Sequence, residues 1–258
     1  MKYDMLYPPL VERIYNEETQ KHKKSADGIK AAKTRLHLLY GAYNSGNIHK
    51  KADALLTNLE NGADAKETAT AIMKLHASTN ERLLHLDALY AFIEKHTGTV
   101  ESVLDLGCGF NPFSVLHMPL LPKTYHAYDI DMRTKDLLNR FFSVLKLPQT
   151  ADCADLAVET PTPHVDLALM SKLIPVLESQ SQGRGFALAN NTNAKFLVIT
   201  YPLKSLGGRE KGMGKNYAAQ FESAVTGGKL KNFVMVDNMK IGSELVYIMM
   251  AKNLPLLG

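Results

Sequence analysis

The spacing of hydrophobic positions changes near residue 98. Before that point apolar residues recur every three or four positions, which is the period of an amphipathic helix. One such stripe, opposite a face of lysines and an arginine, consists of Ile29, Ala32, Leu36, Leu39 and Tyr43. Ser78 or Thr79 is the expected N-cap of the last helix in this region. The pattern predicts helices over residues 27–43, 50–60, 64–75 and from 78 or 79 to 94.

After residue 98 short apolar runs alternate with helical stretches. The runs cover residues 100–107, 125–131, 165–170 and 194–202. This alternation is typical of a doubly wound α/β domain with a mainly parallel sheet. The last pair of runs, "NFVMVDNMKIG" and "SELVYIMMAK", meets at Gly242 without a helix between them, so we expect an antiparallel hairpin at the edge of the sheet. The chain is expected to divide into a helical region, 1–97, and an α/β domain, 98–258.

Composition adds few constraints. The chain has 258 residues, of which 45% are hydrophobic and 22% charged, as in ordinary globular proteins. Its two cysteines, Cys108 and Cys153, provide neither a disulfide framework nor a cysteine-rich zinc site, and no metal is expected. The N-terminus lacks the apolar core of a signal peptide, and no run approaches the roughly 20 apolar residues of a membrane span. We therefore expect a cytoplasmic protein.

The charge is unevenly distributed along the chain. The net charge is only +4, yet between residues 20 and 51 eight cations and one acid, Asp27, give a net charge of +7. These cations are Lys21, Lys23, Lys24, Lys30, Lys33, Arg35, Lys50 and Lys51. Such clustering is typical of a surface that faces nucleic-acid phosphates, although a solvated helix face is the alternative. A second basic group consists of Lys204, Arg209, Lys211 and Lys215.

A glycine loop, "DLGCGFNP" (105–112), follows the first predicted strand. Gly107 and Gly109 allow a sharp turn and a close approach of the backbone to a ligand. The spacing D-x-G-x-G differs from both the dinucleotide fingerprint and the phosphate loop, so it suits a ligand without a phosphate. Asp105 would anchor the loop or meet a cationic group. Cys108 is expected to be a packing residue rather than a nucleophile, because a nucleophilic cysteine needs a nearby base.

Two further acids stand where a nucleoside would need them. Asp129 ends the second strand about 20 residues past the loop, where a carboxylate can accept hydrogen bonds from ribose hydroxyls. Asp155 follows the third strand and is placed to accept from an adenine amino group. Together with the glycine loop, these acids predict S-adenosylmethionine as the cofactor. The alternative is a tight strand-to-helix turn that binds no ligand.

Three stretches carry a more specific resemblance. "KLHASTNERL" (74–83), "LDLGCGFNP" (104–112) and "SLGGREKGMGKNYAAQFES" (205–223) resemble, in order and spacing, the aminoglycoside-resistance 16S rRNA guanine-N7 methyltransferases of the Arm, Rmt and Sgm type. The resemblance covers residues from about 29 to the end. It implies a class I, Rossmann-like methyltransferase domain with a seven-stranded, mainly parallel sheet, preceded by an all-helical N-terminal domain that docks on the 30S subunit. It also implies a monomer.

The resemblance further implies an activity and its residues. The product would be 7-methylguanine in decoding-site helix 44 of 16S rRNA, with resistance to 4,6-disubstituted deoxystreptamine aminoglycosides such as kanamycin and gentamicin. S-adenosylhomocysteine would be the second product. Arg82 would meet the methionine carboxylate, and the full set of implied cofactor residues is His76, Ala77, Ser78, Arg82, Gly107, Gly109, Asp129, Asp155, Leu156, Ser171 and Gln180. Those implied to position the target nucleotide are Lys211, Met213 and Asn216.

The chemistry of this reaction requires no general base. Guanine N7 carries a free lone pair and can attack a sulfonium methyl without losing a proton, so catalysis should depend on proximity and alignment. Reaching N7 in a paired helix requires extrusion of the base, for which Met213, Phe110 and Tyr217 are candidate contacts. Methylation of another rRNA position, such as a neighbouring adenine N1, and an inactive RNA-binding module are the alternatives. The motifs "HASTNER" and "KGMxxNY" and the intact pocket residues argue against both.

Overall fold

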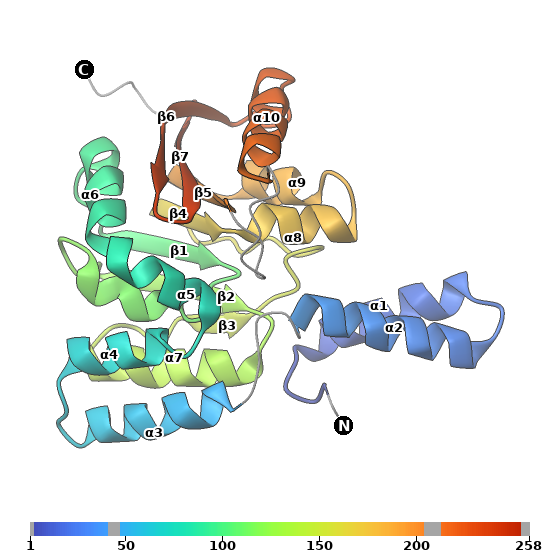
Figure 1. The fold of residues 1–258 in the computed structure, drawn as a ribbon, viewed down its shortest axis with the longest axis horizontal. Helices are drawn as coiled ribbons and strands as arrows, with labels where there is room; N and C mark the ends of the chain where they lie inside the picture. The colour runs from blue at the N-terminus through green and yellow to red at the C-terminus, as the bar shows by residue number, and fades with distance from the viewer. Residues whose placement is uncertain (1–2, 41–46, 204–212, 254–258) are drawn as a thin grey trace.

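The computed structural model describes residues 3–40, 47–203 and 213–253, and it has a central sheet covered by helices on both faces (Figure 1). The strand order is β3-β2-β1-β4-β5-β7-β6. The first five strands in sequence pair in parallel, whereas β7 is antiparallel to both β5 and β6. The strands are β1 (Ser102–Leu106), β2 (Thr124–Asp129), β3 (Ala151–Cys153), β4 (Val165–Ser171), β5 (Ala194–Pro202), β6 (Phe233–Ile241) and β7 (Glu244–Ala251).

Strand alternation creates two separate cores, one on each face of the sheet. Val103 and its period-two equivalents pack under one group of helices, and Leu104 and its equivalents pack under the other. The first group is α3 (Ile48–Glu60), α4 (Ala65–Met73), α6 (Leu86–Thr97) and α7 (Met132–Val144). The second group is α8 (Leu173–Gln180), α9 (Arg184–Asn191) and α10 (Met213–Thr226). Helices α3, α4 and α6 therefore share a core with the sheet.

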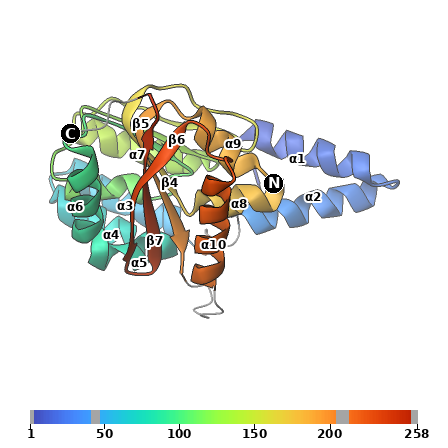
Figure 2. The ribbon, with the colours of Figure 1, turned by 90° about the horizontal axis from the view of Figure 1, so that it is seen from above.

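The first two helices have a core of their own. Helices α1 (Pro8–Lys21) and α2 (Ser25–Tyr40) form a hairpin that projects beside the carboxyl ends of the strands (Figures 1 and 2). A Cβ on Gly28 would lie 2.8 Å from Thr19 Cα, so this glycine permits the close approach of the two helices. Tyr7 N donates to Ile130 O at 2.8 Å and ties the hairpin to the end of β2. Its small core consists of Leu6, Leu10, Ile14, Ala32 and Leu36.

The expected fold class is confirmed, including the antiparallel hairpin of β6 and β7. The single helix expected from 78 or 79 to 94 is wrong, because α5 (Ala77–Arg82) is followed by a 3₁₀ turn, η1 (Leu83–His85), before α6 begins. Neither Ser78 nor Thr79 is its N-cap: His76 occupies that position, and the Thr79 hydroxyl donates to Met73 O at 2.6 Å. The apolar period continues through the break and conceals it.

The ends of other elements differ from the predicted ones by a few residues. Helix α2 begins at Ser25, and its predicted end at Tyr43 lies outside the described residues. Asp64 is the N-cap of α4 and accepts from Glu67 N at 2.8 Å, which accounts for the start of that helix. Within residues 3–40, 47–203 and 213–253, no helix is long and apolar enough to cross a membrane.

Candidate functional site

A cavity of about 1120 Å³, part of it open solvent, lies at the carboxyl ends of β1, β2 and β4. The strand order reverses at β1, because β2 and β3 lie on one side of it and β4 and β5 lie on the other. Open α/β sheets bind ligands at such a topological switch point. Ala77 is exposed and is not among the residues that line the cavity. The other predicted cofactor residues all line it: His76, Ser78, Arg82, Gly107, Gly109, Asp129, Asp155, Leu156, Ser171 and Gln180.

The glycine loop takes the conformation that its sequence predicted. Gly107 and Gly109 have φ angles of +66° and +50°, in the left-handed region that favours glycine. A Cβ on Gly107 would also lie 2.8 Å from Leu173 Cδ1. Gly109 N donates to Asp129 Oδ2 at 2.8 Å, so the loop is tied to the end of β2. Burial raises the pKa of the Asp129 carboxyl above its usual value.

Asp105 anchors the loop from below. Its Oδ2 accepts hydrogen bonds from Asn111 Nδ2 at 2.7 Å and from the Tyr125 hydroxyl at 2.8 Å. Burial raises the pKa of Asp105 to about 6, against the lowering effect of these two hydrogen bonds. Cys108 is buried beside it, and burial, with the nearby charges of Asp129 and Asp105, raises the pKa of the thiol well above its usual value. Cys108 is therefore a packing residue rather than a thiolate nucleophile.

Arg82 supplies a buried positive charge at the cavity. Its Nε and Nη2 donate to the two carboxylate oxygens of Glu244 at 3.0 and 2.8 Å, and its Nη1 donates to Asn111 Oδ1 at 2.5 Å. Lys172 Nζ lies 3.4 Å from Glu244 Oε1. Burial alone would raise the pKa of Glu244, but Arg82 and Lys172 outweigh it and lower that pKa to about 2. A guanidinium has more N–H groups than these contacts use, so Arg82 can still bind an anionic ligand group.

His76 and Phe110 form part of the cavity wall. Their rings lie 5.6 Å apart, and Phe110 also meets the ring of Phe113 edge-on at 5.7 Å. Burial, with the nearby side chains of His49, Lys172 and Arg82, lowers the pKa of His76 to about 4, so its imidazole is neutral at neutral pH. Phe110 is only 1% exposed. Phe110 nevertheless lines the cavity, so its contact with an extruded base stays a prediction.

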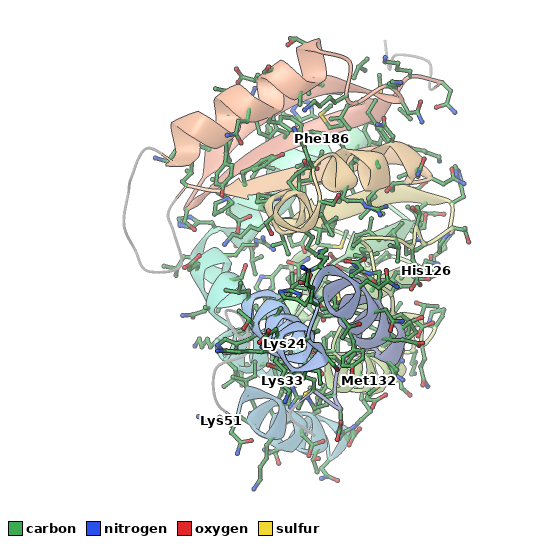
Figure 3. The ribbon with its side chains drawn as sticks, turned by 90° about the vertical axis from the view of Figure 1, so that its right-hand side faces the viewer. Lys24, Lys33, Lys51, His126, Met132 and Phe186 are labelled. Carbon is green, nitrogen blue, oxygen red and sulfur yellow. The ribbon has the colours of Figure 1, made fainter. Side chains whose placement is uncertain are left out.

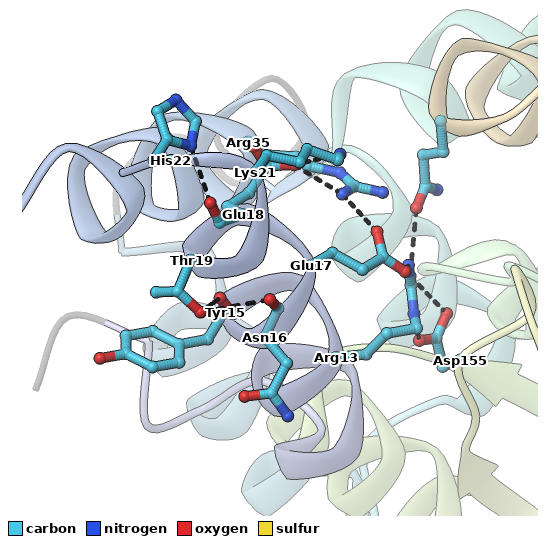
Figure 4. A network of polar contacts seen from close by, with 11 residues as sticks. Arg13, Tyr15, Asn16, Glu17, Glu18, Thr19, Lys21, His22, Arg35 and Asp155 are labelled. Carbon is cyan, nitrogen blue, oxygen red and sulfur yellow. Dashed lines mark hydrogen bonds and ion pairs between the residues drawn. The ribbon is translucent and has the colours of Figure 1, made fainter. Parts of the chain in front are cut away.

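The N-terminal hairpin forms one wall of the cavity, which sequence reasoning missed. Leu10 comes from α1, and Leu39 and Tyr40 come from α2. Arg13 of α1 reaches Asp155 with two of its nitrogens (Figure 4). The sequence predicts only that residues 1–97 dock on the 30S subunit. No local pattern in residues 8–21 distinguishes an inward-facing arginine from a surface one.

The first basic group is partly neutralised by two acids that precede it in the sequence, Glu17 and Glu18. Arg35 Nη1 lies 2.6 Å from Glu17 Oε2 and 2.9 Å from Glu18 Oε1, and Lys21 Nζ lies 3.0 Å from Glu18 Oε1. Figure 3 looks onto the hairpin, where Lys24 and Lys33 are labelled, with Lys51 on the neighbouring α3. The exposed cations of the group are Lys21, Lys23, Lys24, Lys30, Lys33, Lys50 and Lys51.

The second basic group cannot be placed in the same way. Lys204, Arg209 and Lys211 lie outside the described residues, and the side chains of Met213, Lys215 and Asn216, in the first turn of α10, do so too. Tyr217 is partly buried, and its ring lies 5.4 Å from that of Tyr201. The positioning roles of Lys211, Met213 and Asn216 therefore stay predictions.

The residues that line the cavity fit a nucleoside with an amino-acid tail. Asp129 and Asp155 offer acceptors, Leu156 and Ile130 offer apolar surface, and Arg82 offers a cation. Among residues 3–40, 47–203 and 213–253, no group of three or more His, Cys, Asp or Glu residues could hold a metal ion.

Known proteins match this chain over almost its whole length. Residues 1–248 match the sequence model of the family described as ribosomal RNA methyltransferase (FmrO). A 16S rRNA (guanine(1405)-N(7))-methyltransferase of Serratia marcescens is 37% identical over 247 residues, which are 96% of this chain and 92% of that protein. A protein of the same name from Micromonospora rosea is 31% identical over 255 residues, covering 96% and 91% of the two chains.

Solved structures give the same result. The 16S rRNA methyltransferase RmtF in complex with S-adenosyl-L-homocysteine superposes with a TM-score of 0.84 at 33% identity, covering 97% of this chain and 93% of that one. The 16S rRNA methylase RmtB superposes with a TM-score of 0.81 at 32% identity, over 97% and 93% of the chains.

Proposed function

Because the chain belongs to the FmrO family of ribosomal RNA methyltransferases, we propose that it transfers a methyl group from S-adenosylmethionine to N7 of a guanine in decoding-site helix 44 of 16S rRNA. It is then a 16S rRNA (guanine-N7)-methyltransferase, as the three sequence motifs predicted. The consequence is resistance to 4,6-disubstituted deoxystreptamine aminoglycosides. The observation that carries the proposal is the nearly full-length match to relatives named for this reaction, together with a cavity lined by the predicted cofactor residues.

Each part of the cofactor has a counterpart in the cavity. We assign the ribose hydroxyls to Asp129, the adenine amino group to Asp155 and the methionine carboxylate to Arg82. The turn at Gly107 and Gly109 brings the backbone close to the ligand without a Cβ between them. When bound, S-adenosylmethionine supplies an electrophilic sulfonium methyl, and S-adenosylhomocysteine remains after transfer.

The protein contributes alignment rather than proton transfer. N7 of guanine is an acceptor with a free lone pair, so its attack releases no proton from the base. His76 has a pKa near 4 and is neutral, and the Cys108 thiol is held protonated, so neither is poised as an acid or a nucleophile. We assign the positioning of the extruded guanine to Lys211, Met213 and Asn216. Catalysis on this view comes from proximity and in-line geometry.

Docking on the 30S subunit is assigned to the exposed lysines of the N-terminal hairpin and α3. Phosphate contacts of this kind give affinity without reading sequence, and structured RNA is recognised largely by shape. The second basic group, with Lys204, Arg209 and Lys215, would hold RNA on the other side of the cavity. We propose that the protein acts in the cytoplasm as a monomer.

One experiment tests the activity. Purified protein is incubated with tritiated S-adenosylmethionine and either intact 30S subunits or naked 16S rRNA, and the labelled nucleotide is mapped. We expect N7 label on one helix 44 guanine of intact subunits. Label on an adenine would favour methylation at another position, and the absence of label on subunits would favour an inactive RNA-binding module.

A further inference from the structure

Arg13 connects the N-terminal hairpin to the cofactor cavity. Its Nε donates to Asp155 Oδ2 at 2.5 Å and its Nη2 donates to Asp155 Oδ1 at 3.1 Å (Figure 4). The Asp155 side chain is 3% exposed and the Arg13 side chain 16%. Two parallel N–H···O bonds between a guanidinium and a carboxylate fix the plane of the carboxylate as well as its position.

Arg13 is itself held from two sides. Its Nη1 donates to Glu17 Oε1 at 2.9 Å, one turn further along α1, and its Nη2 lies 3.4 Å from Gln180 Oε1 at the end of α8. Gln180 also lines the cavity. The guanidinium therefore stands where α1, α8 and the segment after β3 meet.

The two hydrogen bonds from Arg13 leave Asp155 able to bind a ligand. Each carboxylate oxygen has two lone pairs, and Asp155 Oδ2 uses one of them for Arg13. Asp155 Oδ1 accepts from Arg13 and from Ala157 N at 3.2 Å. The free lone pair of Oδ2 can accept a hydrogen bond from an amino group, and its direction is set by Arg13.

We infer that Arg13 is a positioning residue of the cofactor site, which directs the Asp155 carboxylate at the adenine amino group. The inference rests on the proposed S-adenosylmethionine-dependent function. It makes α1 part of the apparatus that distinguishes adenine from other bases, in addition to any part in RNA docking. An arginine is required because lysine keeps the charge but loses the planar fork.

Base discrimination is the property that tests this role. S-adenosylhomocysteine and S-inosylhomocysteine differ at the position that faces Asp155, where an amino donor is replaced by a carbonyl acceptor. The binding of both to the full-length chain is measured by calorimetry for the wild type, Arg13→Lys and Arg13→Ala. We expect the wild type to prefer the adenosine compound, and both variants to lose about tenfold or more of that preference.

Arg140→Lys is the matched control. Arg140 makes a comparable fork, with Nε and Nη2 each 2.8 Å from the two oxygens of Glu60, but it joins α7 to α3 away from the cavity. This variant should keep the wild-type preference. A preference unchanged in both Arg13 variants, or weakened equally by Arg140→Lys, would overturn the inference.

Failure of the inference is separable from failure of the proposed function. Subunit methylation by the wild type and by the Arg140→Lys control should map to N7 of the same guanine. If discrimination is unchanged while that mapping holds, only the role of Arg13 is refuted. If the wild type itself does not methylate N7, the proposed function fails.

Discussion

Arg82 and Glu244 form a buried, two-pronged ion pair between the end of α5 and the first residue of β7. Their side chains are 4% and 5% exposed, and 162 positions separate them in sequence. The pair joins the "HASTNER" segment to the C-terminal hairpin. Both partners stay ionised: burial acts to lower the pKa of Arg82, but the adjacent Glu244 raises it above its usual value, and the pKa of Glu244 is lowered to about 2.

Removal of the charge on Glu244 should be costly. Glu244→Gln leaves Arg82 buried without its full partner, and breaking a buried pair from one side costs about 3–5 kcal/mol. The free energy of unfolding is measured by urea denaturation. The control is Glu101→Gln, which breaks an exposed pair with Lys123 and should cost less than about 1 kcal/mol. Equal effects of the two substitutions would contradict a structural role for the buried pair.

Cofactor binding and subunit binding should separate by mutation. Arg82→Ala should abolish S-adenosylmethionine binding in calorimetry, because the ligand carboxylate loses its cation. Reversal of Lys23, Lys24 and Lys33 to glutamate should preserve that binding, weaken binding to 30S subunits and reduce its salt dependence.

The control for these lysines is a second triple charge reversal, at the amino ends of the strands. Lys123, Lys146 and Lys195 precede or begin strands, at the amino ends, away from the cavity. Their reversal should change subunit binding much less. If both triples weaken subunit binding equally, the effect is one of total charge, and the hairpin has no special part in docking.

Gly107→Ala should be more harmful than Gly183→Ala. Both glycines have positive φ angles, +66° and +86°, so alanine is strained at either, at a cost of about 1–3 kcal/mol. Only at position 107 would the new Cβ also meet another side chain, Leu173, at 2.8 Å, whereas at 183 nothing lies within 4 Å. Urea denaturation and cofactor calorimetry should show a larger loss for Gly107→Ala. Equal losses would mean that Leu173 yields without cost.

The free energy of unfolding should decrease as the pH is lowered from 6.5 toward 4, because folded His76 stays unprotonated in this range. The pKa of His76 is lowered to about 4 in the folded chain from the ordinary 6.5, so the unfolded state binds more protons between these values. This difference favours unfolding as pH decreases from 6.5 toward 4, by about 2 kcal/mol between pH 7 and pH 5. His76→Gln should lose less stability over that interval. An equal loss would assign the acid sensitivity to other groups.

Much of the fold follows from consecutive residues. The change of period near residue 98, the glycine loop with its positive φ angles and the hairpin at Gly242 are all encoded locally, because helix and strand periods and turn chemistry depend on near neighbours. The motifs also identified the family, and the cofactor residues that they imply, apart from Ala77, line the cavity. The break between α5 and α6 was missed, since the apolar period runs through it.

Tertiary structure alone decided what those residues meet. Arg13 and Asp155 lie 142 positions apart, and no local pattern pairs them. The charge of the hairpin likewise depends on the tertiary structure, because Glu17 and Glu18 of α1 form ion pairs with Arg35 of α2. Sequence therefore determined the elements, the family and the cofactor loop, because these depend on near neighbours. Packing decided that the first helices also form a wall of the cavity, because that contact exists only between distant segments.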